Sequence, residues 1–174
     1  MQMYKFFDVK TPEDLLHKLE REYDRWKADP LNVDLAWNFF VTAEHLPDWN
    51  YYQDMPTSGK LRPDLLDGKN YYDFKMAPIR PVLRICSHLA NGAKHFHLGN
   101  NKLTSVGDTM HQGGLFTKGF FPKGYFARGY FREPALLVRL EPQEQTALGL
   151  SEAVVDALWL AAWVLEFWHR RKIN

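Results

Sequence analysis

Residues 78–96 read "PIRPVLRICSHLANGAKHF", and this stretch indicates a helical fold. Its two prolines fall in a first turn, where proline is tolerated because the first backbone N–H groups have no helical partner. Apolar side chains then recur at helical spacing and form one stripe, made of Val82, Cys86, Leu89, Ala93 and Phe96. A polar stripe lies opposite, made of Arg84, His88, Asn91 and His95. We therefore predict an amphipathic helix over residues 78–96, with one side in a core.

Three other segments carry helix signals. Residues 12–28 follow a threonine and begin with proline, which is typical of a helix start. Residues 33–46 have a wide apolar arc, and the proline that follows is expected to end or kink the helix. Residues 151–170 open on a serine that suits the N-cap position and are apolar on nearly all sides. We predict helices over all three ranges.

Between the last two helices lies a repeat of aromatic and basic residues. Residues 114–133 divide into GLFTK, GFFPK, GYFAR and GYFRE. An odd period does not suit one flat strand, because side chains alternate between the two faces, so we expect the glycines to act as turns or bulges in a twisted hairpin. With a short strand near residue 135, the β insertion covers about 113–141. The predicted fold is mainly α, a four-helix bundle with a small β-hairpin insertion before the C-terminal helix, in a single domain over residues 1–174.

Composition limits the class of protein. The chain has 174 residues, of which 45% are hydrophobic and 25% charged, as in an ordinary globular domain. Its net charge of +1 offers no overall attraction to nucleic acid or to a membrane surface. A single cysteine excludes an intrachain disulfide and a cysteine-based zinc knuckle. The N-terminus lacks the pattern of a signal peptide, and no apolar run is long enough to span a bilayer. We expect a cytoplasmic protein with no membrane partner.

The polar stripe has two interpretations. It is either the solvent-facing side of an amphipathic helix or part of a site, and its basic character without any carboxylate favours a site. The helix at 33–46 carries a polar row inside a mostly apolar surface, and buried polar groups without partners cost about 1–3 kcal/mol each. We therefore expect the two helices to face each other across a cleft, with a second polar row made of Asn38, Thr42, His45 and His88.

The segment "ANGAKH", which begins at Ala90, resembles the motif of the HEPN superfamily, many members of which are RNA-cutting toxins and defence nucleases. Asn91 and His95 match the asparagine and histidine of that motif, while Ala90 stands at the position of its arginine. The resemblance implies a bacterial toxin or defence protein that binds or cleaves RNA without a metal or cofactor. In such a site His95 acts as the base and Asn91 positions the substrate, while Arg84 and Lys94 stabilise charge on the phosphate.

The aromatic and basic repeat leaves three interpretations open. Aromatic rings interleaved with cations bind single-stranded RNA by stacking and phosphate attraction. The rings also suit a β arm that packs inward while its lysines and arginines reach solvent, or a contact with a partner. The residues assigned to RNA or partner binding are Lys118, Phe121, Lys123, Phe126, Arg128 and Arg132. Because Trp159 and Trp163 share one face of the last helix, our alternative function is a non-enzymatic interaction module that forms a homodimer through the β arm and this helix.

Metal and nucleophile chemistry receive less support from the sequence. Candidate metal ligands are His45, Asp48, His88, His95, His97 and His111. His88 and His95 are two helical turns apart, about 10 Å along the axis, so one ion does not reach both without a bend in the helix. His95 and His97 could share an ion only if the helix ends between them. HEXXH, GxSxG and the glycine-rich phosphate motifs are absent. Cys86 lies in an apolar stripe, where a thiol is usually inert. We therefore assign neither a metal nor a cofactor.

Overall fold

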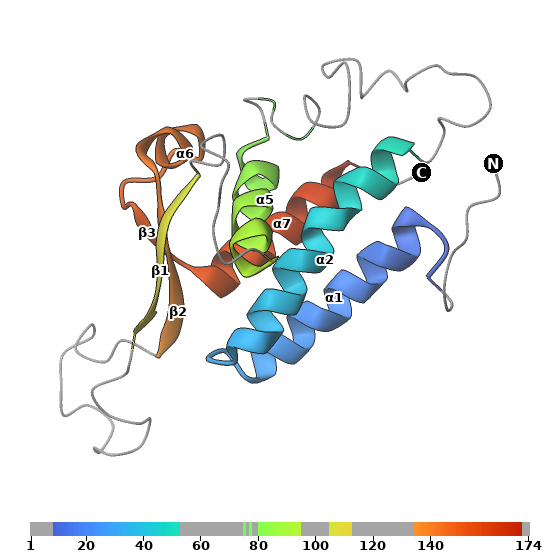
Figure 1. Ribbon diagram of the computed structural model, residues 1–174, viewed down its shortest axis with the longest axis horizontal. Coiled ribbons are helices and arrows are strands. Elements are labelled where there is room, and N and C mark those ends of the chain that lie inside the picture. The colour runs from blue at the N-terminus through green and yellow to red at the C-terminus, as the bar shows by residue number, and fades with distance from the viewer. Residues whose placement is uncertain are drawn as a thin grey trace.

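The structure is a computed structural model, and it describes residues 9–52, 75, 77, 80–94, 105–112 and 134–171. Within these ranges the chain is mainly helical and carries a three-stranded antiparallel sheet (Figure 1). The described elements are α1 (Pro12–Ala28), α2 (Val33–Tyr52), α5 (Pro81–Lys94), β1 (Val106–Gln112), β2 (Ala135–Leu140), α6 (Pro142–Ala147), β3 (Val154–Asp156) and α7 (Ala157–Arg170). A mainly helical class with β structure before the last helix is therefore confirmed.

Helix α1 has the predicted bounds because its start is fixed by side chains. The Asp14 N–H donates to Thr11 Oγ1 at 3.0 Å, and the Thr11 N–H donates in return to Asp14 Oδ2 at 2.8 Å. This capping box satisfies backbone donors that have no partner inside the helix. The apolar stripe that includes Leu15, Leu19 and Trp26 is buried, as its spacing predicted.

Helix α2 extends further than the sequence predicted. It continues through Pro47 to Tyr52 instead of ending near residue 46. Proline removes one helical hydrogen bond, but Asn50 and Tyr51 beyond it are buried, with 3% and 2% of their surface exposed. Packing of the last turn therefore outweighs the local cost of the proline.

Helix α5 starts later than expected, at Pro81 instead of near residue 78. The Arg80 N–H donates to the Ala77 carbonyl at 2.9 Å, and the Arg80 carbonyl accepts the Arg84 N–H at 3.3 Å, so Arg80 directly precedes the helix. Pro81 then occupies the first helical position, which tolerates a residue without an N–H. The last two residues of the predicted helix, 95 and 96, lie outside the described residues.

The sheet has the order β1-β2-β3, and both pairs are antiparallel. Met110 lies opposite Leu137 in the first pair, and Val138 lies opposite Val155 in the second. A β-bulge interrupts β1 between Val106 and Asp108. The first strand thus begins before the predicted 113–141 insertion, and the repeat at 114–133 lies outside the described residues.

The predicted helix over 151–170 is wrong in its first part. Residues Val154–Asp156 form strand β3, and α7 begins only at Ala157. Asp156 rather than Ser151 is the N-cap, because its Oδ1 accepts the N–H groups of Leu158 and Trp159 at 2.7 and 3.2 Å. Valine favours strands, and pairing with β2 supplies the hydrogen bonds that this short segment needs. The short helix α6 and strand β3 had not been predicted.

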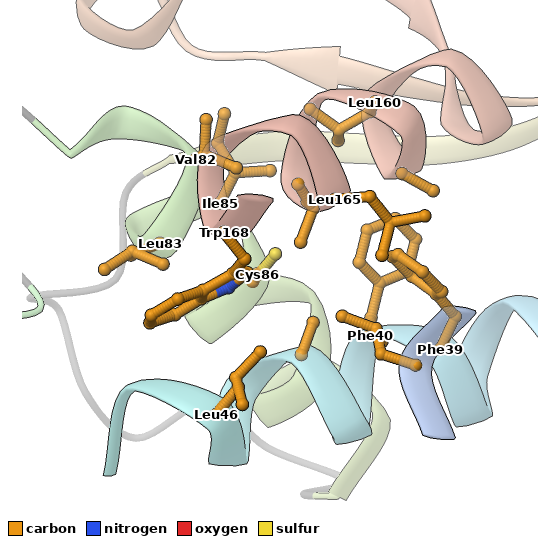
Figure 2. Close-up of a cluster of buried hydrophobic side chains, with 14 of the residues drawn as sticks. Phe39, Phe40, Leu46, Val82, Leu83, Ile85, Cys86, Leu160, Leu165 and Trp168 are labelled. Carbon is orange, nitrogen blue, oxygen red and sulfur yellow. The ribbon is translucent and has the colours of Figure 1, made fainter. Parts of the chain in front are cut away.

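The core includes residues of α1 and the sheet as well as the place where α2, α5 and α7 meet. Figure 2 shows Cys86 of α5 beside Trp168 of α7, with Leu46 of α2 pointing toward them. These three side chains are at most 1% exposed. Helix α5 also contacts β1 and α6, so the sheet and α6 sit beside it at one end of the helices (Figure 1). None of the helices described here combines the length and the apolar character that crossing a membrane requires.

Candidate functional site

A cavity of about 470 Å³ opens between the helices and the sheet. Its walls come from the first half of α2, the second half of α5, and strands β1 and β2, and Ala157 at the start of α7 also lines it. This volume falls within the range of small-molecule pockets. The lining is largely apolar and includes Val33, Trp37, Phe40, Leu89, Leu136 and Val138, with the polar side chains of His88, Asp108, Thr109 and His111.

His88 is held rigidly in the cavity wall. Its Nδ1 accepts the backbone N–H groups of Ser105 and Val106 at 3.0 and 2.9 Å. Backbone N–H groups only donate, so Nδ1 carries no proton and the imidazole is neutral, with its proton on Nε2. Among the described residues, no group accepts a hydrogen bond from Nε2. His88 is only 9% exposed and lines the cavity, so this N–H remains available for a bound molecule.

Burial also favours the neutral form of His88. Desolvation lowers the pKa of the imidazole, and the nearby carboxylate of Glu141 acts in the opposite direction. The β-bulge in β1 belongs to the same arrangement, because the Val106 N–H is used by His88 at the point where the register of the β1–β2 pair shifts. The cavity wall therefore carries a neutral imidazole in a fixed orientation.

A buried ion pair between Arg84 and Glu144 holds Ser105, one of the two residues that orient His88. Arg84 donates from Nε and Nη2 to the two carboxylate oxygens of Glu144, at 2.8 and 2.6 Å. Ser105 Oγ donates to Glu144 Oε1 at 2.9 Å, and the Glu144 side chain is fully buried. Because Ser105 also binds His88 through its backbone N–H, the ion pair positions the loop residue that orients the imidazole.

The three described residues of the polar stripe of α5 have separate partners. Arg84 is neutralised by Glu144, His88 faces the start of β1, and Asn91 donates from Nδ2 to the Ser87 carbonyl of its own helix at 2.7 Å. His95 and the side chain of Lys94 lie outside the described residues. The RNA-cleaving hypothesis drawn from the HEPN resemblance stays a prediction.

The α2 residues of the second polar row differ in their surroundings. Thr42 is buried, but its Oγ1 accepts from Lys18 Nζ of α1 at 2.6 Å, so it points away from α5. Asn38 and His45 are exposed. Thr42 therefore contacts α1, and the contacts described here do not join this row to the polar stripe of α5, so the cleft between the two rows stays a prediction.

Sequence reasoning missed the polar residue that does join α2 to α5. Glu44 is buried, and its Oε1 accepts from Lys75 Nζ at 2.5 Å and from Ser87 Oγ at 3.3 Å. A carboxylate one turn after Phe40, inside the apolar arc of α2, was the signal that could have found it. Glu144, by contrast, has no local pattern that predicts its burial.

The remaining predictions concern the aromatic and basic repeat, metal binding and the last helix. Lys118, Phe121, Lys123, Phe126, Arg128 and Arg132 fall outside the described residues, so their role in RNA or partner binding stays a prediction. In the part of the chain that the structure describes, no three His, Cys, Asp or Glu side chains are close enough to hold a metal. Trp159 and Trp163 stack on α7 with ring centroids 4.4 Å apart, and Trp159 is 39% exposed. The homodimer hypothesis stays a prediction too.

Comparisons with protein-family models, curated proteins and solved structures find no match to this chain. The functional assignment therefore rests on the residues and geometry of the cavity.

Proposed function

We propose that this protein binds a small, mainly apolar molecule in the cavity between α2, α5 and the sheet, and that His88 holds it by one hydrogen bond. The observation that carries the proposal is the fixed orientation of His88, because its Nδ1 accepts two backbone N–H groups and its Nε2 has no acceptor among the described residues. An apolar cavity with a few convergent polar groups is the usual form of a small-molecule site.

The lining also indicates which kind of molecule the cavity suits. No lysine or arginine lines the cavity, so its walls do not suit a phosphate group.

We also propose that α1, α2, α5 and α7 form one four-helix bundle, because each of them contacts at least two of the others. Such a bundle gives the cavity one rigid wall, and the sheet gives it the other.

The test uses Nile red, an uncharged apolar dye whose fluorescence rises in apolar surroundings. We expect saturable binding to one site on the full chain. A Cβ placed at Gly92 meets no heavy atom within 4 Å, so Gly92→Phe fits on α5 and occupies part of the cavity that this residue lines. This variant should lower the affinity for the dye at least about tenfold, because the bound molecule and the new ring compete for one space.

The matched control is Ala28→Phe, which adds the same ring at an exposed position of α1 outside the cavity lining. It should leave the affinity for the dye unchanged. Circular dichroism should show that both variants fold. If Gly92→Phe binds the dye as tightly as the original chain, the cavity is not the binding site and the proposal is wrong.

A further inference from the structure

The groups around His88 bear on the charge of the polar end of a ligand, and the inference drawn from them rests on the proposed function. The imidazole of His88 cannot take a second proton at Nδ1 without losing both hydrogen bonds from the Ser105 and Val106 N–H groups. It therefore meets a ligand as a neutral donor and not as a cation. A neutral donor suits a carbonyl, amide or hydroxyl oxygen, whereas a buried carboxylate needs a charged partner or several donors.

The charged groups near His88 also disfavour an anionic ligand. Asp108 lines the cavity, and the carboxylate of Glu141 is close enough to influence His88. Arg84 cannot serve as a counter-ion, since both its Nε and its Nη2 are bound to Glu144 in a buried pair. Among the lining residues there is no lysine or arginine to offset an anionic ligand.

We propose that the site selects an apolar molecule with an uncharged oxygen acceptor, such as an amide, ketone or alcohol, and rejects the corresponding carboxylate. The apolar body of the ligand lies against the side chains of α2 and the sheet, including Phe40 and Leu136. The polar end accepts a hydrogen bond from His88 Nε2. Selection arises because only the uncharged group is left fully satisfied inside the cavity.

The test compares octanamide with octanoate, which have the same chain and nearly the same shape but differ in charge. Both compete with Nile red for the full chain at neutral pH. Octanamide should displace the dye with an affinity at least about tenfold higher, since an unsatisfied buried charge costs more than 1.4 kcal/mol, which is the equivalent of one factor of ten. Equal displacement by the two compounds, or stronger displacement by octanoate, would overturn the inference.

Variants of His88 identify the group responsible. His88→Asn keeps an acceptor near the position of Nδ1, so it preserves the bonds from Ser105 and Val106 but lacks the Nε2 donor. It should weaken octanamide binding about tenfold and leave octanoate binding almost unchanged. His88→Gln, which retains a donor near the position of Nε2, should restore part of the preference for the amide. His17→Asn, at an exposed residue of α1, is the control and should change neither affinity.

The outcomes separate the two proposals. If the dye binds and Gly92→Phe weakens it, but octanamide has no advantage, the binding function stands and the charge selection fails. If Gly92→Phe does not weaken dye binding, the proposed function itself fails, whatever the fatty compounds do. If His88→Asn keeps the full preference for octanamide, the preference exists but His88 is not its source, and the inference is wrong.

Discussion

His88 shows why residue spacing alone did not identify the site. It shares a helix face with Arg84 and Asn91, yet the three side chains have three different partners: the start of β1, Glu144 of α6, and the backbone of α5. The stripe lacks carboxylates because the carboxylate for Arg84 comes from another helix. The carboxylate that pairs with this basic stripe is supplied by another part of the chain, the buried Glu144.

The ionisation of His88 makes the stability of the protein depend on pH. Its pKa is lowered by burial, so the unfolded chain binds a proton at this residue at a higher pH than the folded chain does. The contribution of His88 to the free energy of unfolding is complete above its ordinary pKa of about 6.5 and is lost as the pH falls through the lower, folded pKa. Urea unfolding followed between about pH 7.5 and 5 should show this decrease.

The matched variant for this experiment is His88→Asn, which cannot titrate but keeps an acceptor for the two N–H groups. Over the same range its free energy of unfolding should fall less steeply than that of the original chain. The difference between the two slopes isolates His88 from the other histidines. Parallel slopes would show that the imidazole is not held in its neutral form.

At the scale of elements, the Arg84–Glu144 ion pair connects α5 to α6. Both side chains are almost fully removed from solvent, at 11% and 0% exposed. Glu144→Leu leaves the Arg84 cation without its partner, and we expect it to lower the free energy of unfolding by about 3–5 kcal/mol. Adding Arg84→Met to that variant should recover a large part of the loss, since no buried charge is then left unpaired. Urea titrations of both variants measure the effect.

An exposed ion pair provides the comparison. Arg170 and Glu166 lie on the surface of α7, where their side chains are 77% and 50% exposed. Glu166→Gln should change the free energy of unfolding by less than about 1 kcal/mol, because water and salt screen exposed pairs. If Glu144→Leu proves equally mild, the Arg84–Glu144 pair does not hold the two helices together.

Local signals predicted those elements that depend on local interactions. The bounds of α1 follow from its capping box and its apolar spacing, both of which are present in the sequence. Strand β3 was missed because Val154–Asp156 becomes a strand by pairing with β2, far away in sequence. Pro47 misled the prediction for α2 because burial of the following turn depends on other elements. The candidate cavity was missed for the same reason, since its walls come from separate parts of the chain.

For the whole molecule, Cys86 provides a measure of global unfolding. It is 1% exposed in the core, and burial, together with the charge of Glu44, raises the pKa of its thiol. A thiol reacts as the thiolate, so iodoacetamide should alkylate the native protein very slowly and the urea-unfolded chain quickly. Mass spectrometry of the labelled chain measures both rates. Rapid labelling under native conditions would mean that α5 separates from α7 without unfolding of the whole protein.

Asp156 joins strand β3 directly to helix α7. It is the last residue of β3, opposite Leu137, and it is also the N-cap of α7, with no loop residue between strand and helix. Leu137 belongs to the wall of the cavity, and α7 carries Trp168 into the core. The strand and the helix are therefore joined without a loop, and β2 also packs against α7. A change in the position of the sheet that forms the cavity wall would thus also change the position of the first turn of α7.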